Sequence, residues 1–176
     1  MKKTEVIFPA NAIKKNILKM VVKEQTERLI LYAEERIKKI GDDISVAQTR
    51  HNLDRTGNLL DSVCWGVCYG GKLKKYGYYR NETAYEDSHL HEYSRPMGEV
   101  VNGRAKASMF IAQYKPKIHN GWEVFFAVLA PYWGYWETGF THPSGREFHW
   151  FVMTSHYDSI ASDLKPSAVR FNIYKP

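Results

Sequence analysis

The chain has 176 residues, of which 44% are apolar and 25% are charged. These are ordinary globular values, and they exclude a disordered, collagenous or coiled-coil protein. The length fits one domain, and no stretch approaches the roughly 20 apolar residues that a membrane-spanning helix needs. Lys and Arg outnumber Asp and Glu by 25 to 19, which is compatible with an anionic partner but identifies none.

A long amphipathic helix is predicted from residue 11 to residue 40. Apolar or small side chains recur there at intervals of three and four residues, at Leu18, Val22, Thr26, Leu29, Ala33, Ile37 and Ile40. Asn11 can cap the start of this helix, and Gly41 can supply the left-handed residue that ends it.

A short helical turn and a strand follow. In the segment Arg55 to Ser62, Thr56 or Asn58 can cap the turn, and Gly57 allows the backbone to bend before it. Residues 63–69 are rich in strand-forming side chains and end at Gly70 and Gly71. Cys64 and Cys68 lie on one face of this strand, so we expect two reduced core thiols rather than a disulfide.

The middle of the chain is harder to assign. Residues 72–107 are polar, Tyr-rich and long for a connection, which predicts a projecting hairpin or loop. Residues 109–114 and 122–129 flank a turn that contains Asn120 and Gly121, a pattern that predicts two antiparallel strands.

The C-terminal part is predicted to hold a second helix over residues 147–164 and a final strand over residues 169–174, separated by Pro166. The order of elements therefore predicts an α+β fold of one domain. Its sheet is mainly antiparallel, and the two helices cover one side of it.

Candidate chemistry is sparse in this sequence. His89 and His91 could share a face of a strand, but no third ligand with metal spacing follows, and a polar loop gives the same pattern. The thiols lie in an apolar strand where burial blunts their reactivity, and no glycine-rich phosphate loop is present. We therefore expect no enzyme activity, no metal and no cofactor.

A nucleic-acid surface is the best chemical alternative. Lys72, Lys74, Lys75 and Arg80 alternate with tyrosines, and cations with aromatic faces suit phosphates and bases. A lysine-protected edge strand would give the same pattern, so both interpretations remain open.

Two segments together resemble a known family, the head-to-tail joining or tail-completion proteins of tailed bacteriophages. The first segment contains Thr56, Gly57, Asn58 and Leu59, and the second runs from Ala130 through Glu137 and Gly139 to Phe140. Their order and separation fit the family. Trp133, Phe140 and the long stretch 72–107 depart from its usual pattern.

The resemblance implies a virion structural protein that forms a ring of identical copies between the portal of the head and the tail. It implies portal or adaptor and tail proteins as partners, at most weak contact with DNA, and the host cytoplasm as the place of assembly. Large aromatic side chains at this density exceed what one side of a small core usually absorbs. We therefore expect a subunit interface at Tyr132, Trp133, Tyr135, Trp136 and Glu137. Two further interpretations remain open: Glu137 could cap a helix, or the segment could be an aromatic core corner.

Overall fold

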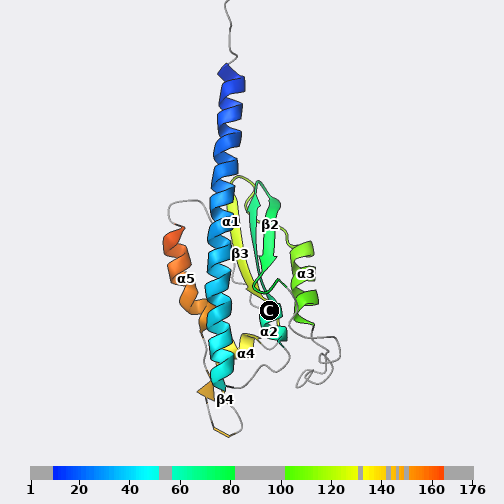
Figure 1. The fold of residues 1–176 in the computed structure, drawn as a ribbon, viewed down its shortest axis with the longest axis vertical. Helices are drawn as coiled ribbons and strands as arrows, with labels where there is room; N and C mark the ends of the chain where they lie inside the picture. Colours follow the sequence, from blue (N-terminus) through cyan, green and yellow to red (C-terminus); the bar gives the residue numbers. More distant parts are fainter. Residues whose placement is uncertain are drawn as a thin grey trace, which may run out of the picture.

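The computed structural model describes residues 10–51, 57–81, 102–130, 133–141, 144–145, 147–148 and 151–164. Its dominant element is the helix α1, Ala10–His51, which is longer than the predicted range at its C-terminal end. Side chains at helical spacing bury one face of α1 against the sheet, at Leu29, Ala33, Ile37, Ile40 and Ile44. Figure 1 shows that the N-terminal part of α1 extends beyond the sheet.

The expected end of α1 at Gly41 is wrong, because this glycine lies inside the helix and serves packing instead. A Cβ atom placed on Gly41 would lie 2.2 Å from the ring of Tyr79. Leu18 was expected in the core, but its side chain is 61% exposed.

The sheet contains three antiparallel strands in the order β2-β1-β3. They are β1, Val63–Tyr69, β2, Lys72–Tyr78, and β3, Trp122–Val128. Gly70 and Gly71 have φ angles of 61° and 74° and form the tight turn between β1 and β2. The stretch 72–107, predicted as a projecting hairpin or loop, instead contributes β2 to the sheet, where it pairs with β1, and its residues 103–107 are helical. Residues 82–101 lie outside the described ranges.

Helices cover both faces of the sheet rather than one. Alternate β1 side chains point to α1, including Val63, Trp65 and Val67. Cys64 and Cys68 point to the opposite face, where they pack with the helix α3, Gly103–Gln113.

The strand predicted at residues 109–114 is wrong, because these residues belong to α3 and the following Tyr114. The apolar run Met109 to Ala112 has no clear period, and such a run fits a helix and a strand equally well. Of the apolar side chains in α3, only those of Ala107 and Ile111, which are four residues apart, are buried. The antiparallel partner of β3 is β1.

Four short elements and one further helix complete the part of the fold that the structure describes. They are α2, Asn58–Asp61, α4, Trp133–Thr138, β4, Phe140–Thr141, β5, Glu147–Phe148, and α5, Val152–Asp163. The helix predicted at 147–164 thus begins five residues later, since residues 147 and 148 pair with β4. The strand predicted at 169–174 lies outside the described residues.

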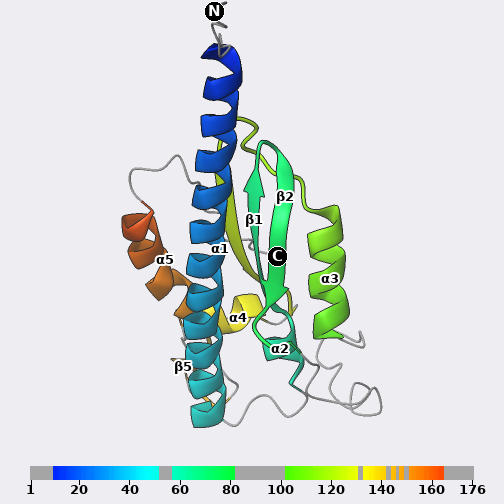
Figure 2. The ribbon, with the colours of Figure 1, turned by 45° about the horizontal axis from the view of Figure 1, so that its top comes forward.

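The helix α5 packs on α1 rather than directly on the sheet, and Figure 2 shows it beside α1. Polar contacts join the two helices: Arg36 forms an ion pair with Asp163, and His156 Nε2 lies 2.8 Å from Asp43 Oδ2. The predicted α+β class, with an N-terminal helix, a C-terminal helix and an antiparallel sheet, is confirmed.

Candidate functional site

The first motif segment fixes α2 against α3. Gly57 has a φ of 72°, which a glycine adopts without strain, and Leu59 is buried in the core. The side chain of Asn58 accepts a hydrogen bond of 3.0 Å from the backbone N–H of Gly103, the first residue of α3. A Cβ on Gly103 would lie 1.9 Å from the carbonyl oxygen of Asn58, so only glycine fits. Thr56 lies outside the described residues.

Ser62 joins the first motif segment to the second. Its hydroxyl donates to the carbonyl of Leu59 at 2.7 Å and accepts from the backbone N–H of Ala130 at 3.1 Å. Its carbonyl accepts from the N–H of Leu129 at 3.3 Å. Ser62 is fully buried, so these bonds tie together two segments that are 68 residues apart in the sequence.

The aromatic segment is partly inside the subunit. Trp133 is only 4% exposed and belongs to the core between α1 and the sheet. The expectation that Trp133 lies at a subunit interface is therefore wrong. Tyr135 and Trp136 lie within α4, but their side chains are outside the description, as is all of Tyr132. Gly139 follows α4 with a φ of 93°.

Glu137 caps the start of α5. Its Oε1 accepts from the backbone N–H and the hydroxyl of Thr154 at 2.6 and 2.7 Å, and its Oε2 accepts from the N–H of Met153 at 3.2 Å. Phe151 precedes α5 with a φ of 49° and offers no capping side chain. Glu137 is 8% exposed, so the expected intersubunit charge is wrong and the alternative of a helix cap holds.

The basic segment does not act as one patch. Lys72, Lys74 and Lys75 are exposed on β2, the edge strand, and Lys74 occupies the irregularity opposite Val67 and Cys68. Arg80 lies apart from them, because its Nη1 is 3.7 Å from Oδ1 of the buried Asp61. Three lysines rather than four cations are therefore available to a partner on this strand.

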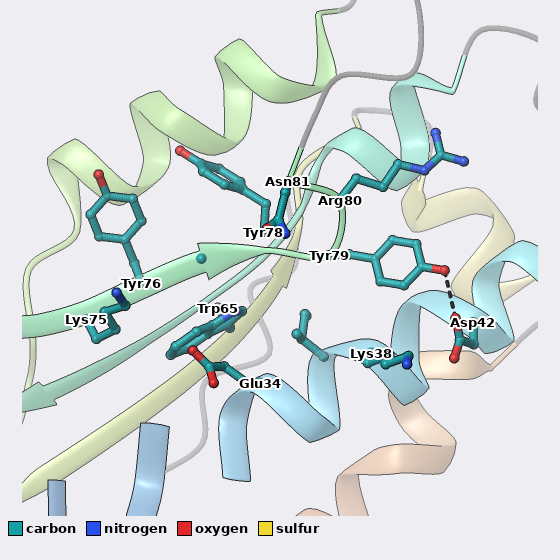
Figure 3. A pocket seen from close by; sticks show the side chains of 12 residues that line it. Glu34, Lys38, Asp42, Trp65, Lys75, Tyr76, Tyr78, Tyr79, Arg80 and Asn81 are labelled. Atoms are coloured by element: carbon teal, nitrogen blue, oxygen red, sulfur yellow. Dashed lines mark hydrogen bonds between the residues drawn. The ribbon is translucent and has the colours of Figure 1, made fainter. Parts of the chain in front are cut away.

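A groove of about 650 Å³ lies between α1 and β2. Figure 3 shows Trp65 in it, with Glu34 and Lys38 coming from α1 and Lys75 from β2. A Cβ on Gly77 would lie 2.7 Å from Nε1 of Trp65, so this glycine lets the indole lie against the strand. The groove mixes both charge signs and is not a selective anion site.

Tyr79 closes one end of this groove. Its hydroxyl donates a hydrogen bond of 2.7 Å to Oδ1 of Asp42, drawn as a dashed line in Figure 3. Burial, together with this bond to a carboxylate, raises the pKa of Tyr79 to about 12. The contact holds β2 and α1 together beside Gly41.

A second surface was missed by the sequence analysis. Four large apolar side chains near the N-terminal end of α1 are exposed, at fractions of 56% for Ile17, 61% for Leu18, 71% for Met20 and 51% for Val21. The spacing of Ile17, Val21 and Leu31 could have revealed a second apolar stripe opposite the core stripe. Exposed apolar side chains gathered on one element indicate contact with a partner.

The two cysteines are free and fully buried. Burial raises the pKa of each thiol to about 12. His89 and His91 lie outside the described residues. Within the described ranges, no group of three or more His, Cys, Asp or Glu side chains could hold a metal ion.

Comparisons of the chain with models of protein families, with curated proteins and with solved structures found no match. None of the described helices is both long enough and apolar enough to cross a membrane.

Proposed function

We propose that this chain is a structural protein of a tailed-phage virion, a neck or tail-completion component that forms a ring between the portal and the tail. It acts through assembly rather than through chemistry. Its partners are copies of itself and the portal, adaptor and tail proteins on either side, within the virion and, during assembly, in the host cytoplasm.

The contact between the two motif segments is the observation that carries this proposal. The resemblance rests on two short segments, and a chance similarity would not require them to meet. In this fold Ser62 at the end of the first segment binds the backbone of Ala130 at the start of the second. The same segments position α3 through Asn58 and α5 through Glu137. The motifs thus form one structural junction.

The described surfaces also suit assembly. A ring of identical copies needs two different surfaces on each subunit that meet head to tail. Within the described residues, β2 is an edge strand, and the groove between β2 and α1 lies beside it. An extended segment of a neighbour could pair with such an edge. The aromatic residues Tyr132, Tyr135 and Trp136 remain our proposed contacts for the second surface.

Two tryptophan variants test the proposal as a matched pair. Trp133→Ala removes a buried core side chain and should lower the free energy of unfolding by about 3 to 5 kcal/mol. Trp136→Ala should leave the monomer within about 1 kcal/mol of the original stability and weaken assembly on portal particles, because interface aromatics carry a large share of binding energy. Urea melts and co-sedimentation with portal particles measure the two effects. The proposed interface is contradicted if the unmodified protein does not co-sediment with portal particles. It is also contradicted if Trp136→Ala co-sediments as well as the unmodified protein.

A sequence-independent nucleic-acid-binding protein is the second candidate, and the three exposed lysines of β2 favour it. If these lysines only protect an edge strand, binding to duplex DNA should be weak and should collapse between low and physiological salt. Replacing Lys72, Lys74 and Lys75 together by Gln should then reduce the residual binding and leave assembly intact. Salt-resistant, sequence-selective binding in a fluorescence titration would favour this candidate over the ring.

A further inference from the structure

The outward face of α1 carries a regular, exposed stripe whose charged members form ion pairs along the helix, Arg28 with Glu24 and Lys39 with Glu35. Six exposed residues of this face are spaced alternately four and three positions apart, as in the seam of a coiled coil. They are residues 17, 21, 24, 28, 31 and 35. Three of them are apolar, namely Ile17, Val21 and Leu31, the last 66% exposed. These residues lie opposite the face that packs on the sheet.

Charge divides α1 into two stretches of opposite sign. Residues 14–23 contain four lysines and no acidic residue, whereas residues 24–35 contain four glutamates and one arginine. Two such helices that lie side by side and antiparallel bring the basic stretch of each along the acidic stretch of the other. A parallel pair brings like charges together.

One antiparallel register pairs apolar Val21 with Leu31 and sets opposite charges face to face, while Ile17 lies against Glu35. When Val21 of one helix meets Leu31 of the other, Glu24 meets Arg28, and the same two contacts repeat by symmetry. A shift by one heptad in either direction leaves no apolar pair in the contact. The parallel arrangement places Glu24 on Glu24 and Arg28 on Arg28.

We propose that the free subunit pairs with a second copy through the outward face of α1, antiparallel and in this register. The contact spans residues 17 to 35, about 27 Å of helix. A two-fold contact closes after two copies and cannot by itself build a ring. The pairing therefore goes beyond the ring function and describes how the exposed apolar face is covered before assembly.

Charge exchange at the centre of the contact tests the pairing. Sedimentation of the full chain over about 1 to 100 µM, a range suited to an interface below standard size, should show a monomer–dimer equilibrium. Glu24→Arg alone and Arg28→Glu alone should each raise the dimer Kd at least about tenfold. An equimolar mixture of these two variants should form a heterodimer, because each mismatched charge then meets its opposite.

Cysteine pairs test the orientation. A mixture of Val21→Cys and Leu31→Cys proteins should give a disulfide between the two different variants if the helices are antiparallel, and only like-with-like disulfides if they are parallel. The native Cys64 and Cys68 are buried and should stay unlinked, so the original chain is the control.

Val46→Glu provides the matched control for Leu31→Glu. Both side chains are exposed apolar residues of α1, but Val46 lies beyond the contact. Leu31→Glu should abolish the dimer and Val46→Glu should not, with circular dichroism showing that both proteins fold.

A monomer at every concentration, equal effects of the two variants, or like-with-like disulfides would overturn the pairing. A monomer that binds anionic vesicles through α1 would replace the second copy with a lipid surface. Ring formation on portal particles is measured separately, so either proposal can fail alone.

Discussion

Glu137 shows how one side chain can organise the end of this fold. It comes from α4, yet its carboxylate satisfies two backbone N–H groups and a hydroxyl at the start of α5. These N–H groups have no partner within their own helix, and the positive end of the helix favours an anion there. Because the residue is buried, water cannot readily replace it.

Replacing Glu137 by Ala should therefore destabilise the folded state. We expect the free energy of unfolding to fall by about 2 kcal/mol, since the buried donors lose their acceptor. Asp158→Ala, on the exposed side of the same helix, should change stability by less than about 0.5 kcal/mol. Equal urea midpoints for Glu137→Ala and the original protein would show that the cap contributes nothing.

Four buried or half-buried groups predict the alkaline limit of stability. Burial raises the pKa of Cys64 and Cys68 from 9.0 to about 12, and that of Tyr32 and Tyr79 from 10.0 to about 12. The unfolded chain loses these protons at lower pH than the folded one. The stabilisation is thus complete below the unfolded pKa values and is lost as pH rises from about 9 towards 12.

Melting temperatures across this range should fall steadily, and the two thiols should resist thiol reagents near pH 8 until denaturant is added. Tyr79→Phe should flatten the alkaline fall, because it removes one of the titrating groups. Rapid labelling of either thiol in the folded protein would contradict this account.

At the scale of elements, the sequence predicted those helices, strands and turns whose form depends on residues close together in the chain. The core face of α1 was predicted from Leu29, Ala33, Ile37 and Ile40, because helical spacing alone selects it. The turn at Gly70 and Gly71 and the strand before it were equally clear. The identity of α3 was not, since its apolar run has no period of its own. Its helical form depends on Asn58 and Asn102, whose side chains accept from its first backbone N–H groups.

The candidate site was predicted less well than the fold, because burial is a tertiary property. Trp133 and Glu137 stand in an aromatic, exposed-looking segment, and only the packing of α1 and α5 places them inside. The exposed face of α1 has the opposite cause. Its side chains are apolar, but they lie on the side of α1 that faces away from the sheet.

Gly41 illustrates a conflict between local and tertiary signals. Alanine in a helix interior is normally favoured over glycine by about 1 kcal/mol. At this position the added Cβ meets the ring of Tyr79, which is held by Asp42. We expect Gly41→Ala to lower the free energy of unfolding by about 1 to 3 kcal/mol. The cost should shrink when Tyr79 is also changed to Ala, so a double-mutant cycle in urea checks it. Increased stability of the single variant would show that helix propensity dominates.

At the scale of the whole molecule, one junction and one long helix define the subunit. The motif segments meet at Ser62 and Ala130, and from there α3 and α5 are placed on opposite sides of the fold. The helix α1 passes the whole length of this body and extends beyond it. Within the described residues, β2 is left as an edge strand and the outer face of α1 is left exposed.

Cryo-electron microscopy of the purified protein bound to portal particles tests the central claim most directly. The account predicts a closed ring of copies of this fold around the channel axis, at the tail-facing end of the portal. Density for a single copy, for copies scattered over the particle, or for no copy at all would contradict it.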